Sequence, residues 1–224
     1  MQVQLRHQPS FTVARLYLAP GEPAQVEKGA MLATSYGIGV QASMQGGFGK
    51  ALGRMMAGES LSISTFTAPQ GGGWVDVADK LPGDLQVIEL DGRVSWLITG
   101  SCWIASSHAV QTETQFGGAK SMMGGESAFL TRASGQGPVV VSCYGALETV
   151  NLQQGEMITI DTGHVVAFAE TVQNQVRKVA EGAMQSFKSG EGLVFDFAGP
   201  GQVITQSRSL GALAEWVVAQ VPRR

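Results

Sequence analysis

The chain has 224 residues, of which 44% are hydrophobic and 15% are charged, and its formal net charge is −3. This composition predicts a folded chain with a sizeable core, because disordered chains are charged and poor in β-branched and aromatic residues. Nucleic-acid affinity rests mainly on Lys and Arg, and no basic run appears in the sequence, where Arg223-Arg224 form only a short tail, so we expect no nucleic-acid partner.

Short apolar stretches rich in Val, Ile, Trp and Phe, separated by glycine or proline turns, predict strands along most of the chain. These stretches lie at residues 13–20, 31–40, 61–66, 74–82, 87–90, 94–105, 128–131, 139–144, 149–152, 157–169 and 193–197. A glycine-rich connection after the first middle strands leaves room for a short helix at residues 50–57. The predicted fold class is all-β.

The tail, residues 207–224, has a different period. Its apolar residues recur at helical spacing, with Ser209 as the expected N-cap and Pro222 as the stop, and they are Leu210, Leu213, Ala214, Val217, Val218 and Val221. A helix of roughly 18 Å is too short to span a bilayer. We expect its apolar face to dock on a sheet or on a neighbouring subunit.

Glycines recur at nearly constant intervals. The series are Gly21, Gly83 and Gly145, then Gly29, Gly92 and Gly155, then Gly37, Gly100 and Gly163, followed by Ala68, Ala133 and Ala198. This order predicts three repeat units of about 65 residues, at 1–70, 71–136 and 137–206, before the C-terminal helix in 207–224. One such unit cannot bury its apolar face alone, so we expect the three to pack around a pseudo-threefold axis as one compact body.

The two cysteines, Cys102 and Cys143, lie in apolar runs and are predicted to be buried thiols. The N-terminal residues 1–6 lack the apolar segment of a secretory signal, and no apolar run reaches the ~20 residues of a membrane span. We therefore expect a cytoplasmic protein without a transmembrane segment.

No motif in the sequence indicates a catalytic, cofactor or metal site. The three histidines, His7, His108 and His164, form no H-x-H pair, and structural roles are favoured for them. The Gly49-Lys50 pair lacks the flanking residues of a phosphate loop, and Ser106-Ser107-His108 forms no recognisable nucleophile pattern. We assign no catalytic residue, no metal ligand and no cofactor.

One glutamate follows a glycine in each predicted unit, at Glu59, Glu126 and Glu191. The simpler interpretation is that each carboxylate caps backbone N–H groups at its turn. The alternative is a cation site of three axial carboxylates, which requires all three to face the pseudo-threefold axis.

Methionines and phenylalanines gather in the connection just before each Gly-Glu pair. They are Phe48, Met55, Met56, Met122, Met123 and Phe187. Methionine suits adaptable binding surfaces, so these side chains either seal one end of the body or form a partner-binding or membrane-apposed apolar end.

Three segments resemble a known family: residues 190–209, the strand motif at 160–168, and Gly46 to Lys50 with Gly58-Glu59. The sequence is similar to the altered-inheritance-of-mitochondria biogenesis family over nearly its whole length. The resemblance implies a fold like that of the tryptophan RNA-binding attenuation protein, with β-sandwich units of double-stranded β-helix type. The resemblance also implies a link to membrane organisation, and it supplies no catalytic residue to carry over to this sequence. We expect this chain to differ from mitochondrial members in lacking a targeting segment.

The leading hypothesis is a non-enzymatic, homo-oligomeric scaffold or interaction protein with an unknown protein partner and, through its apolar connections, peripheral membrane contact. The second is a small-ligand binder with a pocket lined by Trp74, Trp96 and Trp103, although tryptophans more often belong to the core. The third is an enzyme of unknown reaction.

Overall fold

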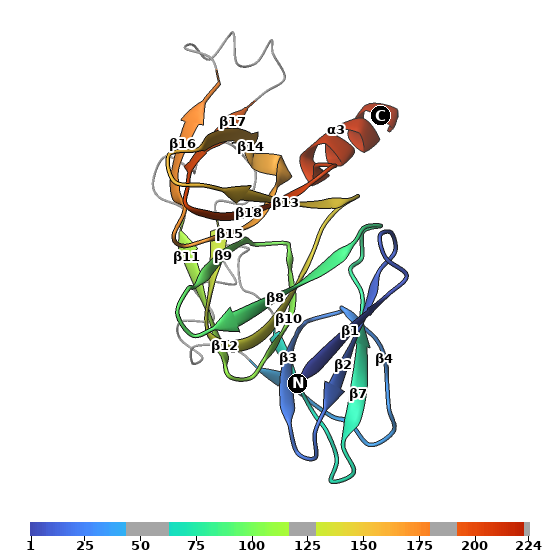
Figure 1. Ribbon diagram of the computed structural model, residues 1–224. Helices are drawn as coiled ribbons and strands as arrows, with labels where there is room; N and C mark the ends of the chain where they lie inside the picture. The colour runs from blue at the N-terminus through green and yellow to red at the C-terminus, as the bar shows by residue number, and fades with distance from the viewer. Residues whose placement is uncertain (44–62, 117–128, 180–191, 222–224) are drawn as a thin grey trace.

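The computed structural model describes residues 1–43, 63–116, 129–179 and 192–221 of the chain. Within these ranges the chain is mostly antiparallel β-sheet, with a short 3-10 helix at Thr162–His164 and one α-helix, α3, at Leu210–Gln220 (Figure 1). The predicted all-β class with a C-terminal helix is therefore confirmed.

The first strand set runs from residue 13 to residue 77. Strand β7 pairs with β2 on one side and β4 on the other, while β6 pairs with β3 and β5. Strand β1 (Gln2–Arg6) adds to the free side of β2. The strands of this set are β2 (Val13–Leu18), β3 (Pro23–Glu27), β4 (Met31–Thr34), β5 (Gly39–Ser43), β6 (Ile63–Thr67) and β7 (Gly73–Val77).

The second strand set runs from residue 85 to residue 142 and is organised by one long strand. The first half of β12 pairs with β9 and β11, and its second half pairs with β8 and β10. The strands of this set are β8 (Leu85–Asp91), β9 (Trp96–Thr99), β10 (Trp103–Ser107), β11 (Val110–Phe116) and β12 (Phe129–Ser142).

The third strand set runs from residue 147 to residue 206. Strand β18 pairs with β13 and β15, and β17 pairs with β14 and β16. The strands of this set are β13 (Leu147–Leu152), β14 (Met157–Asp161), β15 (Val165–Ala169), β16 (Gln173–Lys178), β17 (Leu193–Ala198) and β18 (Gly201–Gln206).

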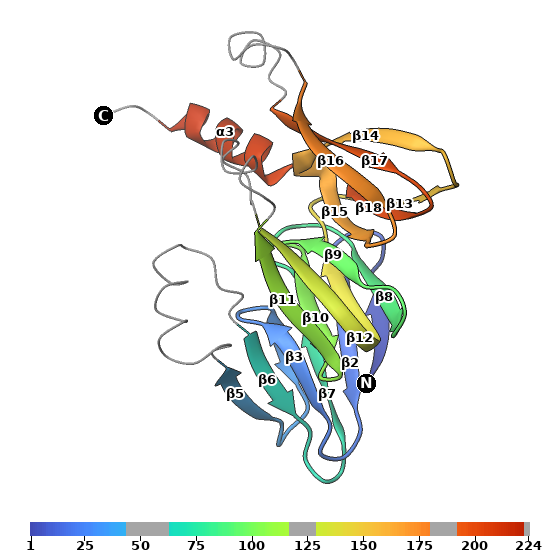
Figure 2. The ribbon, with the colours of Figure 1, turned by 90° about the vertical axis from the view of Figure 1, so that its left-hand side faces the viewer.

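Two junctions join the three sets into a continuous path of strands. Strand β10 pairs with β3, with Ala105 opposite Val26, and β15 pairs with β9, with Ala167 opposite Ile98. The second set consequently lies between the first and the third (Figures 1 and 2). Each junction uses the edge of one sheet to extend the sheet of the next set.

Two hydrophobic clusters form the core. One is built mainly on the first set and includes Leu16, Val26 and Phe66, but it also takes in Ile104 and Val140 from the second set. The other joins the second and third sets, with a group of three aromatic rings made by Phe168, Phe195 and Phe197. Apolar burial thus crosses both junctions, which holds the sets together.

Glycine and glutamate together shape two of the turns. Gly21 and Gly155 adopt positive φ angles of 72° and 83°, which residues with a Cβ rarely tolerate. One residue later, Glu22 and Glu156 each accept a hydrogen bond from the backbone N–H three residues earlier, at 2.8 and 2.6 Å. A short turn is therefore closed in the same way after β2 and after β13.

Candidate functional site

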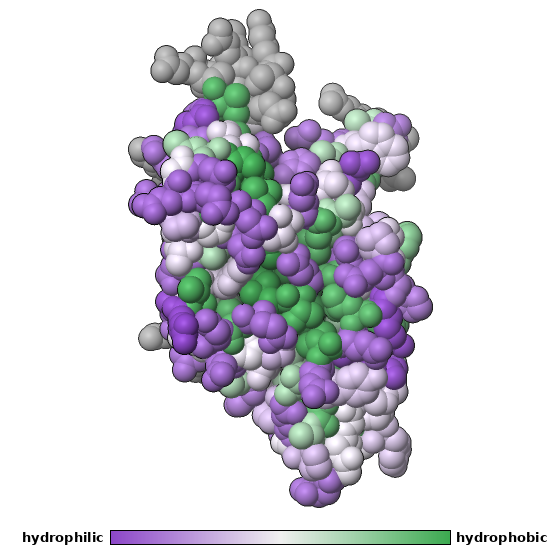
Figure 3. Space-filling view, in the orientation of Figure 1, coloured by the Kyte–Doolittle hydropathy of each residue, from purple (hydrophilic) through white to green (hydrophobic). Residues whose placement is uncertain are grey.

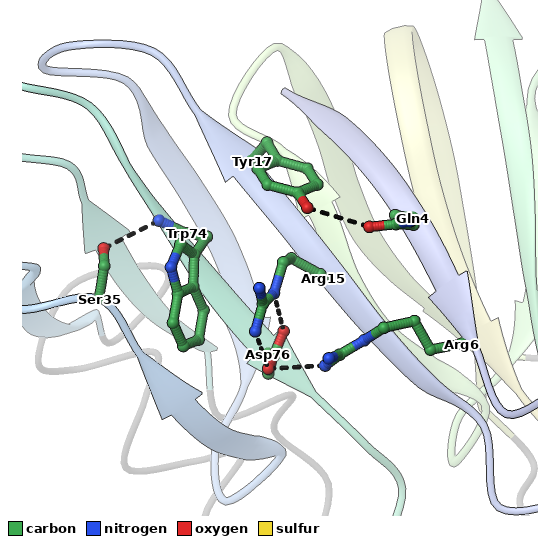
Figure 4. Close-up of polar contacts among 7 residues, drawn as sticks. All are labelled: Gln4, Arg6, Arg15, Tyr17, Ser35, Trp74 and Asp76. Carbon is green, nitrogen blue, oxygen red and sulfur yellow. Dashed lines mark hydrogen bonds and ion pairs between the residues drawn. The ribbon is translucent and has the colours of Figure 1, made fainter.

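The outer face of the sheet β1-β2-β7-β4 carries a cluster of charged side chains (Figure 4). Alternation along β7 turns Val75 and Val77 into the core and places Trp74 and Asp76 on the opposite face. Because the same alternation holds along β2, Arg15 comes to lie directly opposite Asp76 across the sheet.

Asp76 is the centre of this cluster. Its carboxylate accepts two hydrogen bonds from Arg15, both at 2.8 Å, and a third from Arg6 at 2.7 Å. The guanidinium group of Arg15 also lies 3.8 Å above the ring of Trp74, a cation–π contact. Asp76 as a whole is only 4% exposed and its side chain 6%, so almost all of its contacts are with protein.

The electrostatics of the cluster argue against proton transfer. Hydrogen bonds from Arg15 lower the pKa of Asp76 below its usual value, and the same contact raises the pKa of Arg15. A carboxylate held ionised by two cations is a poor general acid or base near neutral pH. The cluster instead links β1, β2 and β7. Sequence reasoning missed it, although charged residues alternating with buried apolar ones in both strands are a usable signal.

The second candidate is helix α3, which extends outward from the strands (Figures 1 and 2). The side chain of Ser209 accepts a hydrogen bond from the Ala212 N–H, so the predicted N-cap is confirmed. None of the helical residues is buried, and Leu213 is only half-buried. Of the two alternatives, docking on a sheet of the same chain is therefore wrong, and docking on a neighbouring subunit stays a prediction.

The apolar side chains of α3 and its C-cap consequently face solvent. Their exposed fractions are 45% for Leu210, 63% for Trp216, 46% for Val217, 71% for Val218 and 60% for Val221. Apolar residues of this size scattered singly are ordinary, whereas here five lie on one short element.

A third candidate is a hollow of about 360 Å³ between β8 and the start of β18. Val87, Trp96 and Gln202 line it, together with the carboxylate-bearing residues Glu89 and Asp91. Figure 3 shows apolar surface gathered in the middle of this side of the molecule, where β8 lies in Figure 1. The lining combines apolar and polar groups, which suits a small ligand.

The three tryptophans proposed for a ligand pocket do not converge. Only Trp96 lines the hollow beside β8, and it is 8% exposed. Trp103 is fully buried in the core, and Trp74 lies beneath Arg15. The expectation of one pocket lined by all three is wrong, and core packing is the main role of Trp96 and Trp103.

The other site predictions have mixed outcomes. The glutamates Glu59, Glu126 and Glu191 and the proposed contact residues Phe48, Met55, Met56, Met122, Met123 and Phe187 all lie outside the described residues. Both cysteines are buried as predicted, and burial raises the pKa of Cys102 and that of Cys143 to about 11.

His164 has the structural role that was favoured. Its ring Nδ1–H donates to the Gln206 carbonyl at 2.8 Å, and the Gln206 amide donates to the Gly163 carbonyl at 2.9 Å. In the ranges that the structure describes, no three His, Cys, Asp or Glu side chains gather as metal ligands would. Nor does any helix in the described part of the chain have the length and apolarity to cross a membrane.

Comparison with known proteins identifies relatives of nearly the same length. An uncharacterised protein of Streptococcus pyogenes serotype M6 is 28% identical over 232 residues, covering 99% of this chain and 92% of that protein. An X-ray crystal structure of a Streptococcus pyogenes protein has a TM-score of 0.83 at 24% identity, covering 98% and 99% of the two chains, and shows the same fold. The family model described as Mitochondrial biogenesis AIM24 matches residues 3–208, which confirms the resemblance drawn from the sequence: this chain belongs to that family.

Proposed function

We propose that this protein is a non-enzymatic scaffold that binds a protein partner through helix α3. The observation that carries the proposal is the exposure of large apolar side chains on α3, led by Trp216 and Val218. Apolar surface of this kind is stabilised when it is removed from water, at about 25 cal/mol per Å². The helix therefore gains from a partner that covers it.

The charges of α3 favour a protein groove over a lipid surface. Between Leu210 and Val221 the only charged residue is Glu215, and there is no Lys or Arg. Helices that lie on membranes usually carry Lys and Arg on their polar face to attract anionic lipids. Leu210, Leu213 and Val217 instead have the i, i+3, i+7 spacing of helix-in-groove anchors.

The body that carries α3 is proposed to be three copies of one six-stranded unit. The support comes from the strand pairing, because in each set the last strand pairs with the first and the third. These last strands are β7, the second half of β12, and β18. In each set the fifth strand pairs with the second and the fourth. These fifth strands are β6, the first half of β12, and β17. Three matching sets of four pairings are the pattern that duplication produces.

A short sequence motif supports the same proposal. Strands β4, β10 and β15 begin Met31-Leu32-Ala33, Trp103-Ile104-Ala105 and Val165-Val166-Ala167, each with two apolar residues before an alanine. In all three strands the register against the partner strand, β7, β12 or β18, shifts just before that alanine. A bulge at one place in each copy is the kind of feature that families retain.

These pairings suggest unit boundaries later than those drawn from the glycine spacing. The proposed copies span residues 13–77, 85–142 and 147–206, instead of 1–70, 71–136 and 137–206. In this register Gly21, not Gly29, belongs with Gly92 and Gly155, because each lies between the first and second strands of its set. Packing as double-stranded β-helix-like units around a pseudo-threefold axis stays a prediction.

The partner-binding role of α3 is tested by placing a benzophenone photo-crosslinker at Val218 and, as the matched control, at exposed Gln175 on β16. In living cells of the source, we expect protein adducts of defined mass from position 218 only, and their loss when Trp216→Ser is added. Adducts to lipid alone, or the same adducts from both positions, would contradict the proposal. Because Trp216 is exposed, the melting temperature of the Trp216→Ser variant should match that of the parent.

The hollow beside β8 supports a second candidate function, small-ligand binding. Its volume of about 360 Å³ is within the range of ligand pockets, and Trp96 gives it an aromatic lining residue. A thermal-shift screen of amino acids and metabolites tests this candidate. A ligand that raises the melting temperature of the parent but not of a Gln202→Ala variant would support it, and a flat response across the screen would end it.

A further inference from the structure

The two internal junctions of the molecule are built in the same way. In each, the strand that carries the apolar-apolar-alanine motif pairs with the second strand of the preceding set: β10 with β3, and β15 with β9. The register is the same as well, because Ala105 lies opposite Val26 and Ala167 lies opposite Ile98. Each of these partners stands five residues before the motif strand of its own set.

One half of such a junction is left over at each end of the row. Among the described strands, β4 pairs only with β7, although it carries the motif of β10 and β15. Strand β14 pairs only with β17, although it holds the place of β3 and β9 in its set. The first set therefore has a free motif strand and the third set has a free acceptor strand.

Exposure at β4 shows what its missing neighbour would cover. Leu32 is 60% exposed, whereas Ile104 and Val166 at the same motif position are fully buried. Ile104 is buried in the core cluster of the preceding set, not in that of its own. Leu32 is therefore placed to enter the core of a neighbouring set.

The free edge of β14 shows the complementary deficit. Ile158 and Ile160 are only partly buried, whereas Val26 and Ile98, which correspond to Ile160, are fully buried. Met157 beside them is 73% exposed. An uncovered motif strand and an uncovered acceptor strand thus lie on one chain.

Neither edge carries the charges that usually protect a free strand. Strand β4 has no charged residue, and β14 has only Asp161 at its end. Four other described strands with a free edge carry a charged residue inside the strand: Glu89 on β8, Glu113 on β11, Glu148 on β13 and Arg177 on β16. Strand β5 carries none, and β1 has only Arg6 at its end. Unprotected apolar edges are templates for pairing with another chain.

We propose that β4 of one molecule pairs with β14 of a second copy of this chain, head to tail, and so repeats the internal junction between molecules. The internal register places Ala33 opposite Ile160 and Thr34 opposite Thr159. This interface is heterologous, so successive copies form a closed ring or an open row. The proposal does not depend on helix α3.

A charged residue in the first set should make the proposed β4–β14 junction between molecules weaker than the two internal junctions. Ala33 pairs with Asp76 on β7, whereas Ala105 and Ala167 pair with Val140 and Ile204. Asp76 therefore stands where the other two sets have an apolar residue, on the face that would meet the neighbouring molecule. Its ion-pair partner Arg15 lies beside it. Ion pairing of Asp76 with Arg15 and Arg6 limits the desolvation cost but leaves a net charge of +1 on this face, so a concentration-dependent association is expected.

Light scattering after size-exclusion chromatography gives the first test. The parent chain should have a mass above its monomer value of 23.5 kDa, falling on dilution, and Leu32→Lys should be monomeric at every concentration. Val40→Lys is the matched control, because Val40 is 55% exposed on β5, an edge strand outside the proposed junction. A parent that is monomeric at all concentrations, or a mass that drops equally in both variants, would overturn the proposal.

Disulfide trapping tests the register and identifies the partner. A Thr34→Cys chain mixed with a Thr159→Cys chain under mild oxidation should give a cross-linked dimer of the two different chains. Ala33→Cys with Ile160→Cys should be tested in parallel, since adjacent antiparallel pairs alternate in geometry and one of them suits a disulfide. No dimer from either mixture, or a bond that forms only within a chain carrying both cysteines, would overturn it. The second result would mean that the three sets close on themselves within one chain.

Discussion

Arg15 and Asp76 lie directly opposite each other on β2 and β7 and form a two-pronged ion pair on the outer face of the first sheet. Arg6 on β1 makes the third hydrogen bond to the same carboxylate. Through Arg6 the Asp76 carboxylate adds a side-chain link between β1 and β7, beside the backbone pairing of β1 with β2 and the Tyr17–Gln4 hydrogen bond. Its loss should affect the folding of this end of the chain.

Replacing Asp76 by Asn should lower the free energy of unfolding by about 2 kcal/mol, because it leaves two partly buried guanidinium groups without a counter-charge. Urea unfolding followed by circular dichroism measures the change. Arg93→Ala is the control: the Arg93–Asp91 pair is well exposed, so its removal should shift the stability by less than about 0.5 kcal/mol. Equal effects in the two variants would contradict this account.

The stabilisation from Asp76 should depend on pH with a definite sign. Since its pKa is lower in the folded protein than in the unfolded chain, its contribution is complete above the unfolded value of about 4 and is lost as the pH falls through the folded value. The stability difference between the parent and Asp76→Asn should be constant from about pH 5 to 8 and shrink below about pH 4. A difference that grew on acidification would show that the carboxylate is not held ionised.

The two cysteines should be unreactive in the folded protein. Burial raises the pKa of Cys102 and of Cys143 to about 11, and only the thiolate reacts with Ellman's reagent. At pH 8 we expect no prompt labelling in buffer and two thiols per chain in denaturant. Rapid labelling of the native protein would mean that the strands around β10 and β12 open readily.

Ser209→Ala should loosen α3 without affecting the body. Loss of an N-cap hydrogen bond costs a helix about 1 kcal/mol, whereas Gly in the same place costs only a few tenths. Because α3 buries none of its residues, faster protease cleavage within the helix should occur at an unchanged melting temperature. A lowered melting temperature would show that α3 packs on the strands in solution.

The sequence predicted the apolar strands, because short β-branched runs between glycine turns have a local signal. It missed five strands that are short or largely polar, namely β1, β3, β11, β16 and β18. The C-terminal helix was also predicted from a local signal, its period and Ser209. Its exposure was not, because the apolar face of a helix does not reveal whether anything covers it. The Asp76 cluster and the separation of Trp74 from Trp103 depend on strand register, which brings together residues 61 positions apart and is set by the whole sheet.

The register of the first strand set shows a further limit. Glycine spacing aligns turns by distance along the chain, so a difference in connection length shifts every later match. In the proposed three-copy register, the motif at Met31-Leu32-Ala33 lies 72 residues before the one at Trp103, but Trp103 lies 62 residues before Val165. An alignment of the sets by which strands pair is insensitive to that difference, because it does not depend on the number of residues between strands.

Strand β12 gives the molecule one further property. It is 14 residues long and pairs with β8, β9, β10 and β11, so its backbone amides lie at the centre of the whole path of strands. Its central amides can exchange with deuterium only when several neighbours separate together. The slowest exchange in the protein should therefore occur along the second half of β12, at the rate set by global unfolding, and the middle set should melt as one cooperative element with both of its neighbours.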